Sequence, residues 1–339
     1  MAAALAACVV AYCSGLTVMT YNVENLFDDI HNGSEYREFD PAAGTWNEEF
    51  FKIRVQSIAE VVRKAVPGGA DILLLQEVEN ENAVRVLADT GLRGLGYTWI
   101  AFVPKNGLSA NVAILSRLPI VRVRSHAVGS LQDGTPLRDV VEAEIQYKGH
   151  RLYVLDNHWK AKTEGARLTE AYRRDAATVL ARRIGEILAL DPRADIIAAG
   201  DMNESLDEYR RVGGKYQTAL LPAAENANDP GRSIFLASRA GDIPSGVQRC
   251  VLYEPWFEME ESRRGSYFYQ GDWLTVDHML LSPGLLDAQG FAYRAGSFGA
   301  CRLPFLLTPE GAPKRGTNLT GQRGYSDHLP LILTLDLKN

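Results

Sequence analysis

The chain has 339 residues, of which 46% are hydrophobic and 23% are charged, and this ordinary globular composition argues against a disordered chain. Its formal net charge of -6 excludes the strongly basic surface of passive nucleic-acid binders, so a protein of this charge that handles phosphates needs a metal cation or a local basic patch. No stretch reaches the ~18 consecutive apolar residues of a membrane span.

The first 15 residues predict an N-terminal extension ahead of the fold. Within them "LAAC" ends at Cys8 and is similar to a bacterial lipoprotein box, yet only seven residues precede this cysteine. The extension is therefore either a clipped export or lipoprotein signal or a plain extension, and we favour export. An exported protein would be periplasmic, lipid-anchored or extracellular, whereas a plain extension leaves a cytoplasmic location open.

Residues 16–339 are predicted to form one domain, because nothing in the middle of the chain resembles a linker. Apolar runs enriched in valine, isoleucine and aromatic residues predict strands along its whole length. These runs are residues 16–21, 71–76, 97–103, 111–116, 140–147, 151–157, 195–200, 273–282 and 329–337.

Two amphipathic patterns predict helices, one from Phe51 to Val66 and one from Leu168 to Ile187. The helices lie between blocks of strands and do not follow each strand in turn, so a parallel doubly wound sheet is disfavoured. The pattern favours an α+β fold of two packed, mostly antiparallel sheets flanked by helices.

Two segments without clear periodicity, residues 204–232 and 241–271, are predicted to be mostly loop. The second leads into an aromatic cluster that either belongs to the core or stacks on bases or a lipid head group: Tyr267, Phe268, Tyr269 and Trp273. The four cysteines form no C-x-x-C pair, which argues against structural zinc. Cys250 and Cys301 either pair in an oxidising compartment or stay as two buried thiols.

Polar residues recur where the predicted strands end. Asn22, Glu77 and His158 each close an apolar run, and Asp201 and Asn203 follow "DIIAAG". Asp327 and His328 come just before the last strand, so antiparallel pairing would bring them to the same rim. Each residue alone has an ordinary structural explanation, such as an Asx turn or a structural histidine. Their joint occurrence predicts a site.

In their order along the chain, these residues resemble the endonuclease/exonuclease/phosphatase family of metal-dependent phosphoesterases. The motifs that carry the resemblance are "TYNVENLF" with Asn22, "LLLQEVEN" with Glu77, "DNHWKAK" with His158, "AAGDMNES" with Asp201 and Asn203, "LTVDHMLLS" with Asp277, and "YSDHLPLIL" with Asp327 and His328. They span nearly the whole chain from Leu16 and are most similar to bacterial nuclease-like members. The resemblance implies a four-layer α/β/β/α sandwich.

The resemblance also implies a divalent metal, Mg²⁺ first and Mn²⁺ or Ca²⁺ as further candidates. Hard cations of this kind prefer a few carboxylate and amide oxygens. Glu77 would be the main metal ligand, with Asn22 and Asp327 beside it. Asp201 would polarise or deprotonate the attacking water, and Asn203 would hold the phosphate or that water.

By the same resemblance, His158 and His328 would flank the phosphoryl group and stabilise the charge that develops on it. Asp277 would orient His328, as in catalytic dyads. The general base is either the aspartate, Asp201, or a histidine, and the sequence leaves this choice open.

Three basic residues are predicted to bind substrate. Strand periodicity would place His158, Lys160 and Lys162 on one face, where the lysines could grip phosphates, although exposed lysines at a strand end would look the same. Arg173, near the start of the following helix, could extend this positive patch. His278 alternates to the face opposite Asp277 and is predicted to be structural.

The sequence thus predicts a Mg²⁺-dependent phosphodiesterase acting on nucleic acid, with DNA as the favoured substrate. A phosphatase or sphingomyelinase of the same fold is the nearest alternative. A binding module that kept the fold without catalysis is the alternative from another class, but such a module usually lacks a metal carboxylate or a histidine.

Overall fold

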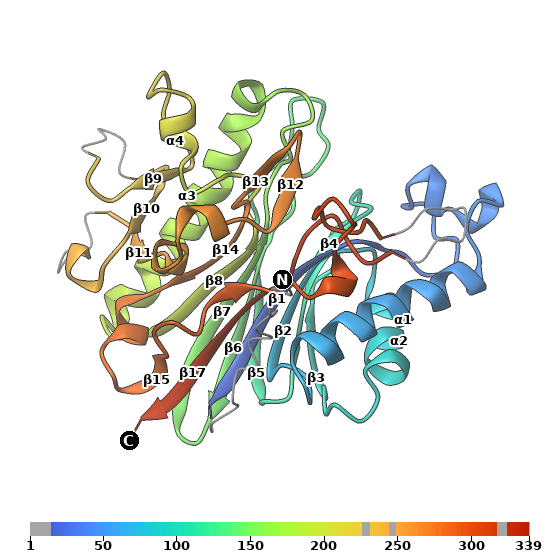
Figure 1. Ribbon diagram of the computed structural model, residues 1–339, viewed down its shortest axis with the longest axis horizontal. Helices are drawn as coiled ribbons and strands as arrows, with labels where there is room; N and C mark the ends of the chain where they lie inside the picture. Colours follow the sequence, from blue (N-terminus) through green and yellow to red (C-terminus); the bar gives the residue numbers. More distant parts are fainter. Residues whose placement is uncertain (1–14, 226–230, 244–248, 317–323, 339) are drawn as a thin grey trace, which may run out of the picture.

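The computed structural model describes residues 15–225, 231–243, 249–316 and 324–338. Their strands form two large sheets that pack face to face, with helices on the outer faces (Figure 1). The predicted α+β sandwich is confirmed. Residues 1–14, which carry almost all of the predicted N-terminal extension, lie outside the described residues. Among the described residues, no helix combines the length and the apolar character that crossing a membrane requires.

The seven-stranded sheet has the order β15-β17-β1-β2-β4-β3, and β16 also pairs with β17. In its centre β1 runs parallel to β2 and antiparallel to β17. Its strands are β1 (Leu16–Leu26), β2 (Ile72–Val78), β3 (Trp99–Phe102), β4 (Asn111–Ser116), β15 (Gly290–Tyr293), β16 (Gly299–Ala300) and β17 (Leu331–Lys338).

The eight-stranded sheet has the order β5-β6-β7-β8-β14-β11-β10-β9. Its strands are β5 (Ile120–His126), β6 (Val140–Tyr147), β7 (His150–His158), β8 (Asp195–Asp201), β9 (Leu220–Pro222), β10 (Ile234–Ala237), β11 (Val251–Tyr253) and β14 (Asp277–Leu281). A separate hairpin joins β12 (Tyr267–Tyr269) to β13 (Asp272–Leu274).

Two long helices cover the outer faces, α1 (Glu48–Ala65) on the seven-stranded sheet and α3 (Ala166–Leu190) on the eight-stranded sheet (Figure 1). The side chain of Asn47 begins α1 by accepting a hydrogen bond from the amide of Phe50. The shorter helices are α2 (Glu81–Val86) and α4 (Glu208–Arg211), with a π turn at Leu87–Gly91 and 3-10 turns at Arg37–Phe39, Pro41–Ala43, Ala240–Asp242, Pro255–Glu258, Glu261–Arg263, Pro283–Leu286 and Pro304–Leu306.

Alternation along the central strands divides the core into two layers. Val18 in β1 and Leu74 in β2 point between the sheets, while their neighbours Met19 and Leu73 point under α1. All four side chains are fully buried, so both faces of these strands are covered. This explains why the strands read as continuous apolar runs in the sequence.

The two segments predicted to be mostly loop contain more regular structure than expected. Residues 204–232 include α4 and β9, and residues 241–271 include β11 and β12. These strands have only three residues each, too few for a periodic pattern, and β9 and β11 pair with β10 only through tertiary contacts. Cys250 and Cys301 are free, partly buried thiols, so the alternative of a disulfide between them is wrong.

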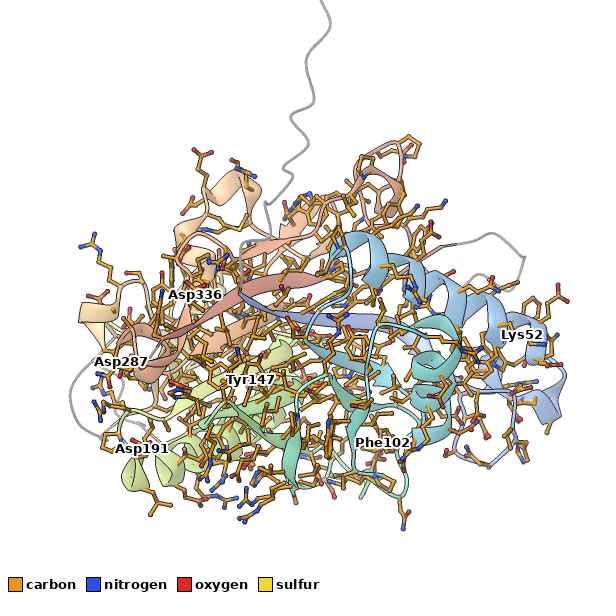
Figure 2. The ribbon with its side chains drawn as sticks, turned by 90° about the horizontal axis from the view of Figure 1, so that it is seen from below. Lys52, Phe102, Tyr147, Asp191, Asp287 and Asp336 are labelled. Carbon is orange, nitrogen blue, oxygen red and sulfur yellow. The ribbon has the colours of Figure 1, made fainter. Side chains whose placement is uncertain are left out.

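Asp195 links the two sheets at the end of β8 opposite Asp201. Its carboxylate accepts a hydrogen bond of 3.0 Å from the amide of Phe291 in β15. Burial raises the pKa of Asp195 to about 7, and the carboxylates of Asp287 and Asp191 add to the shift. Figure 2 labels these two aspartates at the same end of the molecule.

We expect Asp195→Asn to stabilise the protein at high pH. The raised pKa makes the folded state hold a proton that the unfolded chain releases, so stability is lost as pH rises from about 4 towards 7. The amide oxygen of asparagine can still accept the Phe291 hydrogen bond without carrying charge. The melting temperature should therefore rise by about 2–5 °C at pH 8 and hardly at all at pH 4.5, measured by circular dichroism. An equal gain at both pH values would contradict this, and Asp89→Asn, at an exposed aspartate that does not contribute to the Asp195 shift, is the control.

Candidate functional site

Three predicted site residues lie in one row across the eight-stranded sheet. His158 in β7 is the register partner of Asp201 in β8, and Asp201 is the register partner of Asp277 in β14. All three side chains are buried. Strand pairing alone therefore brings His158 and Asp277, which are more than 100 positions apart in the chain, to either side of Asp201.

Asn22 connects this row to the other sheet. Val18, Thr20 and Asn22 share the face of β1 that points between the sheets, because side chains alternate along a strand. The Nδ2 atom of Asn22 lies 3.0 Å from Oδ2 of Asp201 and 3.0 Å from Oε1 of Glu77. One amide group thus donates hydrogen bonds to a carboxylate of each sheet.

Glu77 reaches the site through a local irregularity of β2. Strict alternation after Leu73 and Leu75 would direct Glu77 towards α1. Instead the pairing of β2 with β4 shifts register between Gln76 and Val78, and Glu77 adopts a left-handed φ of 62°. Such a bulge re-aims a side chain, and a strained non-glycine residue often marks a functional site.

Asp327 and His328 enter the site just before β17, the strand beside β1. The hydroxyl of Ser326 donates to the carbonyl of Asn22 at 2.7 Å and fixes this approach. Nδ1 of His328 lies 2.8 Å from Oδ2 of Asp277, while its Nε2 lies 3.8 Å from Oδ2 of Asp201. The contact with Asp277 occupies Nδ1, so Nε2 of His328 faces the centre of the site.

The centre of the site is a cluster of carboxylates that repel one another. Burial raises the pKa of Glu77, and the charge of Asp327 adds to the shift. Burial likewise raises the pKa of Asp327, with Glu24 and Asp201 adding to it and His328 opposing it. A cation would relieve this repulsion, and the carboxylate oxygens of Glu77 and Asp327 are donors that hard divalent cations prefer. The amide of Asn22 turns its nitrogen to the carboxylates, while its oxygen accepts the amide of Glu24 at 3.0 Å. Ligand atoms of Glu77, His158 and Asp201 all lie within 4.8 Å of one another.

His158 and His328 differ in charge near neutral pH. Burial lowers the pKa of His158 well below its usual value, and the positive charges of Arg138 and His328 lower it further. Burial would also lower the pKa of His328, but Asp277 and Asp201 outweigh it and raise that pKa well above its usual value. The site therefore holds a neutral imidazole and an imidazolium on either side of Asp201.

Asp201 and Asn203 are held by the turn that follows β8. Burial raises the pKa of Asp201 to about 6, Asp277 adds to the shift, and His328 opposes it. Oδ1 of Asp201 accepts a hydrogen bond of 2.8 Å from the amide of Asn203, which has a left-handed φ of 50°. Nδ2 of Asn203 donates to the carbonyl of Trp159 at 3.1 Å, so this turn is joined to the one after His158.

The predicted substrate-binding residues have different surroundings. The strand ends at His158, so alternation does not extend to Lys160 and Lys162. Lys160 lines a pocket together with His158 and forms an ion pair of 2.8 Å with Glu164, and Lys162 forms an ion pair of 2.6 Å with Glu208. Arg173 is fully buried and donates all of its guanidinium hydrogens inside the protein, so the prediction that it contacts substrate is corrected.

Arg138 is a site residue that sequence analysis missed. Its charge lowers the pKa of both Glu77 and His158, and its Nε donates to the carbonyl of Ala110 at 3.0 Å. It lies two positions before β6, in a segment without a motif, so no sequence signal marked it. Arg315 was also missed, and it lies 3.0 Å from Asp327.

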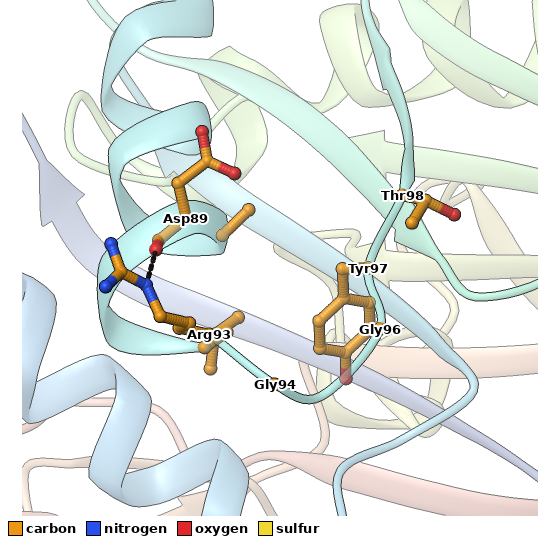
Figure 3. Close-up of a pocket in the computed structure, with 8 residues that line it drawn as sticks. Asp89, Arg93, Gly94, Gly96, Tyr97 and Thr98 are labelled. Atoms are coloured by element: carbon orange, nitrogen blue, oxygen red, sulfur yellow. Dashed lines mark hydrogen bonds between the residues drawn. The ribbon is translucent and has the colours of Figure 1, made fainter.

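A pocket of about 190 Å³ borders the site through His158, Arg138 and Lys160, and its other walls include Leu137, Trp159 and Tyr172. A larger surface pocket of about 420 Å³ lies elsewhere, between the π turn and β3, where Nε of Arg93 donates to the carbonyl of Asp89 (Figure 3). None of the predicted site residues lines this larger pocket. The converging polar groups, and not the size of a hollow, therefore identify the site.

Comparisons with known proteins agree with this geometry. A family model described as "Endonuclease/Exonuclease/phosphatase family" matches residues 17–215, more than half of the chain. A search of curated protein sequences found no match. Among solved structures, truncated TDP2 of Caenorhabditis elegans is similar with a TM-score of 0.56 and 16% identity, over 95% of this chain and 97% of that one.

Two further structures show the same fold. Danio rerio TDP2 complexed with single strand DNA product has a TM-score of 0.53 and 15% identity, over 96% of this chain and 100% of that one. An endonuclease/exonuclease/phosphatase family protein from Bacteroides thetaiotaomicron has a TM-score of 0.52 and 16% identity, over 95% of this chain and 98% of that one.

Glu77→Gln is expected to weaken the binding of Mg²⁺ and Mn²⁺ by at least about tenfold, because it removes a charged oxygen ligand without changing the size of the side chain. Isothermal titration calorimetry with each metal salt measures the effect. Glu81→Gln, an exposed residue on α2 that pairs with Arg85, is the control. Unchanged metal affinity in the Glu77 variant would exclude Glu77 as a ligand.

Proposed function

The chain belongs to the endonuclease/exonuclease/phosphatase family, and on this premise we propose that it is a metal-dependent phosphodiesterase that hydrolyses nucleic acid, with DNA as its favoured substrate. The observation that carries the proposal is the meeting of Asn22, Glu77 and Asp201 from two sheets, with a histidine on either side. Hydrolysis of a phosphodiester needs charge neutralisation and a positioned water, and this arrangement offers groups for both tasks.

Glu77, Asn22 and Asp327 would hold the metal, Mg²⁺ being the first candidate. The bound cation would neutralise charge on the phosphoryl oxygens. The fit rests on burial, which raises the pKa of both Glu77 and Asp327, and on neighbouring carboxylates that add to each shift: Asp327 for Glu77, and Glu24 and Asp201 for Asp327. Without a cation, burying these groups so close together would be costly.

Asp201 is our candidate for the group that takes the proton from the attacking water. With a pKa of about 6 it is ionised at neutral pH, yet close enough to neutrality to accept a proton effectively. Asn203 is held beside it and would orient the water or the phosphate. The water oxygen would then bond to phosphorus as the bond to the leaving ester oxygen breaks.

His328 would stabilise the charge that develops on the phosphoryl group. Its imidazolium form is maintained by Asp277 and Asp201, and the contact of 2.8 Å with Asp277 orients the ring. Neutral His158, 3.7 Å from Asp201, would contribute a hydrogen bond on the other side. In this reading both histidines contact the substrate, and Asp277 acts through His328.

The rim of the site supports a nucleic acid more than a small phosphate ester. The ring of Tyr267 lies 4.7 Å from that of His328, and Tyr269 lies nearly parallel to Tyr267 with half of its surface exposed. Exposed tyrosines can stack on bases. Arg315, whose side chain is 72% exposed, pairs with Glu24 and Asp327, and Lys160 pairs with Glu164. In our proposal these two cations beside the site exchange their carboxylate partners for backbone phosphates. The Danio rerio relative was crystallised with a single strand DNA product.

Glu77→Ala and His328→Ala should each abolish hydrolysis of plasmid DNA or lower its rate by at least about 10³-fold, while folding stays intact by circular dichroism. The same assay should include RNA, an inositol polyphosphate and sphingomyelin, with and without EDTA. Glu81→Ala is the control. Retained DNA hydrolysis in the Glu77 variant would refute the site, and hydrolysis of only the lipid or the inositol substrate would favour the alternative phosphoesterase function.

Asp277→Asn should lower kcat by about 10²- to 10³-fold with little change in KM, because the neutral amide no longer maintains the imidazolium of His328. Steady-state kinetics on a DNA oligonucleotide measures this. Ser266→Ala removes the other hydrogen bond to the same carboxylate oxygen and should have a much smaller effect. Equal losses in the two variants would argue against an electrostatic role for Asp277.

A further inference from the structure

Arg173, which lies in α3 beneath the site, has an unusually complete set of hydrogen bonds. A guanidinium group has five N–H hydrogens, and each has an acceptor within the protein. Nε donates to Glu204 at 3.1 Å, Nη1 to the carbonyl of Lys160 at 3.2 Å and the hydroxyl of Thr169 at 2.9 Å, and Nη2 to the carbonyl of Ala166 at 2.7 Å and the carboxylate of Glu170 at 2.6 Å.

Two of these contacts belong to the two turns that carry the candidate site. Lys160 comes two residues after His158, and Glu204 directly follows Asn203. The turns also bond to each other, because the amide of Trp159 donates to the carbonyl of Asp201 at 2.9 Å and Asn203 donates back to Trp159. Arg173 thus bonds to both the turn after β7 and the turn after β8, which are neighbouring strands.

Glu204 makes further hydrogen bonds, through its side chain and its backbone, that hold it in place. Its second carboxylate oxygen accepts the amide of Leu220 at 2.7 Å. Its carbonyl lies 2.8 Å from Nε2 of buried His278, whose Nδ1 lies 2.5 Å from Glu254. A carbonyl can only accept, so His278 carries a hydrogen on Nε2. These contacts support the left-handed conformation of Asn203, which costs free energy unless its surroundings impose it.

We infer that Arg173 is a positioning residue that holds the His158 turn and the Asp201–Asn203 turn in the relative placement that the reaction requires. This inference rests on the proposed function. Arg173 touches neither substrate nor reacting atoms and acts only through the backbone and carboxylate groups that it orders. The planar fork of arginine is required, because a lysine ammonium has three hydrogens and cannot reach both turns and the start of α3 together.

Arg183 provides a matched control on the same helix. It donates to Glu142 of β6 through Nε at 2.6 Å and Nη2 at 3.0 Å, and its side chain is also largely buried. Loss of its fork should therefore cost stability in a comparable way. Its contacts involve neither of the two turns. Arg183 therefore serves as the control for an arginine in α3 that stabilises the fold without positioning the site.

The experiment compares Arg173→Lys with Arg183→Lys in the full chain. Steady-state kinetics on a single-stranded DNA oligonucleotide in Mg²⁺ gives kcat and KM, and hydrogen exchange of the metal-free protein reports on residues 159–164 and 202–206. In Arg173→Lys we expect kcat to fall about 10- to 100-fold with KM nearly unchanged, and both turns to exchange faster. In Arg183→Lys we expect a lower melting temperature, an unchanged kcat and unchanged exchange in the turns.

Unchanged kcat and unchanged exchange in Arg173→Lys would overturn the inference and leave Arg173 as a stabilising residue only. If Arg173→Lys does not fold, Glu204→Gln weakens the same contact more gently and should show the same two effects on a smaller scale; their absence would be equally decisive. If the wild-type protein hydrolyses no phosphoester, the proposed function fails, and the exchange measurement alone decides whether Arg173 orders the two turns.

Discussion

The site depends on one electrostatic constraint: carboxylates from different parts of the chain are buried close together although they repel one another. Glu77 lies near the end of β2 and Asp327 just before β17 in one sheet, and Asp201 ends β8 in the other. The amide of Asn22 joins Asp201 to Glu77 across the gap between the sheets. The packing of two sheets enforces this proximity, because Glu77 and Asp201 are held in strands whose apolar residues are buried and Asp327 lies in the segment that leads into β17. A cation is the simplest partner that would compensate such a cluster.

The charge states of the two histidines follow from the same constraint. His328 has three carboxylates as neighbours, Asp277, Asp201 and Asp327, and is held as an imidazolium. His158 is buried close to Arg138 and is held neutral. Identical side chains thus acquire different properties from their surroundings, which is the usual way in which one site obtains both an acid and a base. The arrangement suits the hydrolysis of a phosphoester, where charge moves from a water to a leaving oxygen.

Beneath the site, a second set of buried charges gives the turns their shape. Arg173, Glu204 and His278 make hydrogen bonds to one another or to the same turn, and none of them contacts solvent appreciably. Buried ion pairs contribute little net stability, so their value here is the fixed geometry of the segments that they join. This network also explains why the sequence led to the wrong prediction that Arg173 binds substrate: one of its two carboxylate partners, Glu204, lies 31 residues away in the chain.

The sequence by itself determined the class of fold, the two long helices and the residues that end the central strands, because apolar periodicity is a local property of the chain. Only the tertiary structure decided that a bulge turns Glu77 into the site, that Arg173 is buried and that Arg138 approaches His158. These features depend on strand register and on partners distant in sequence, which no local pattern encodes.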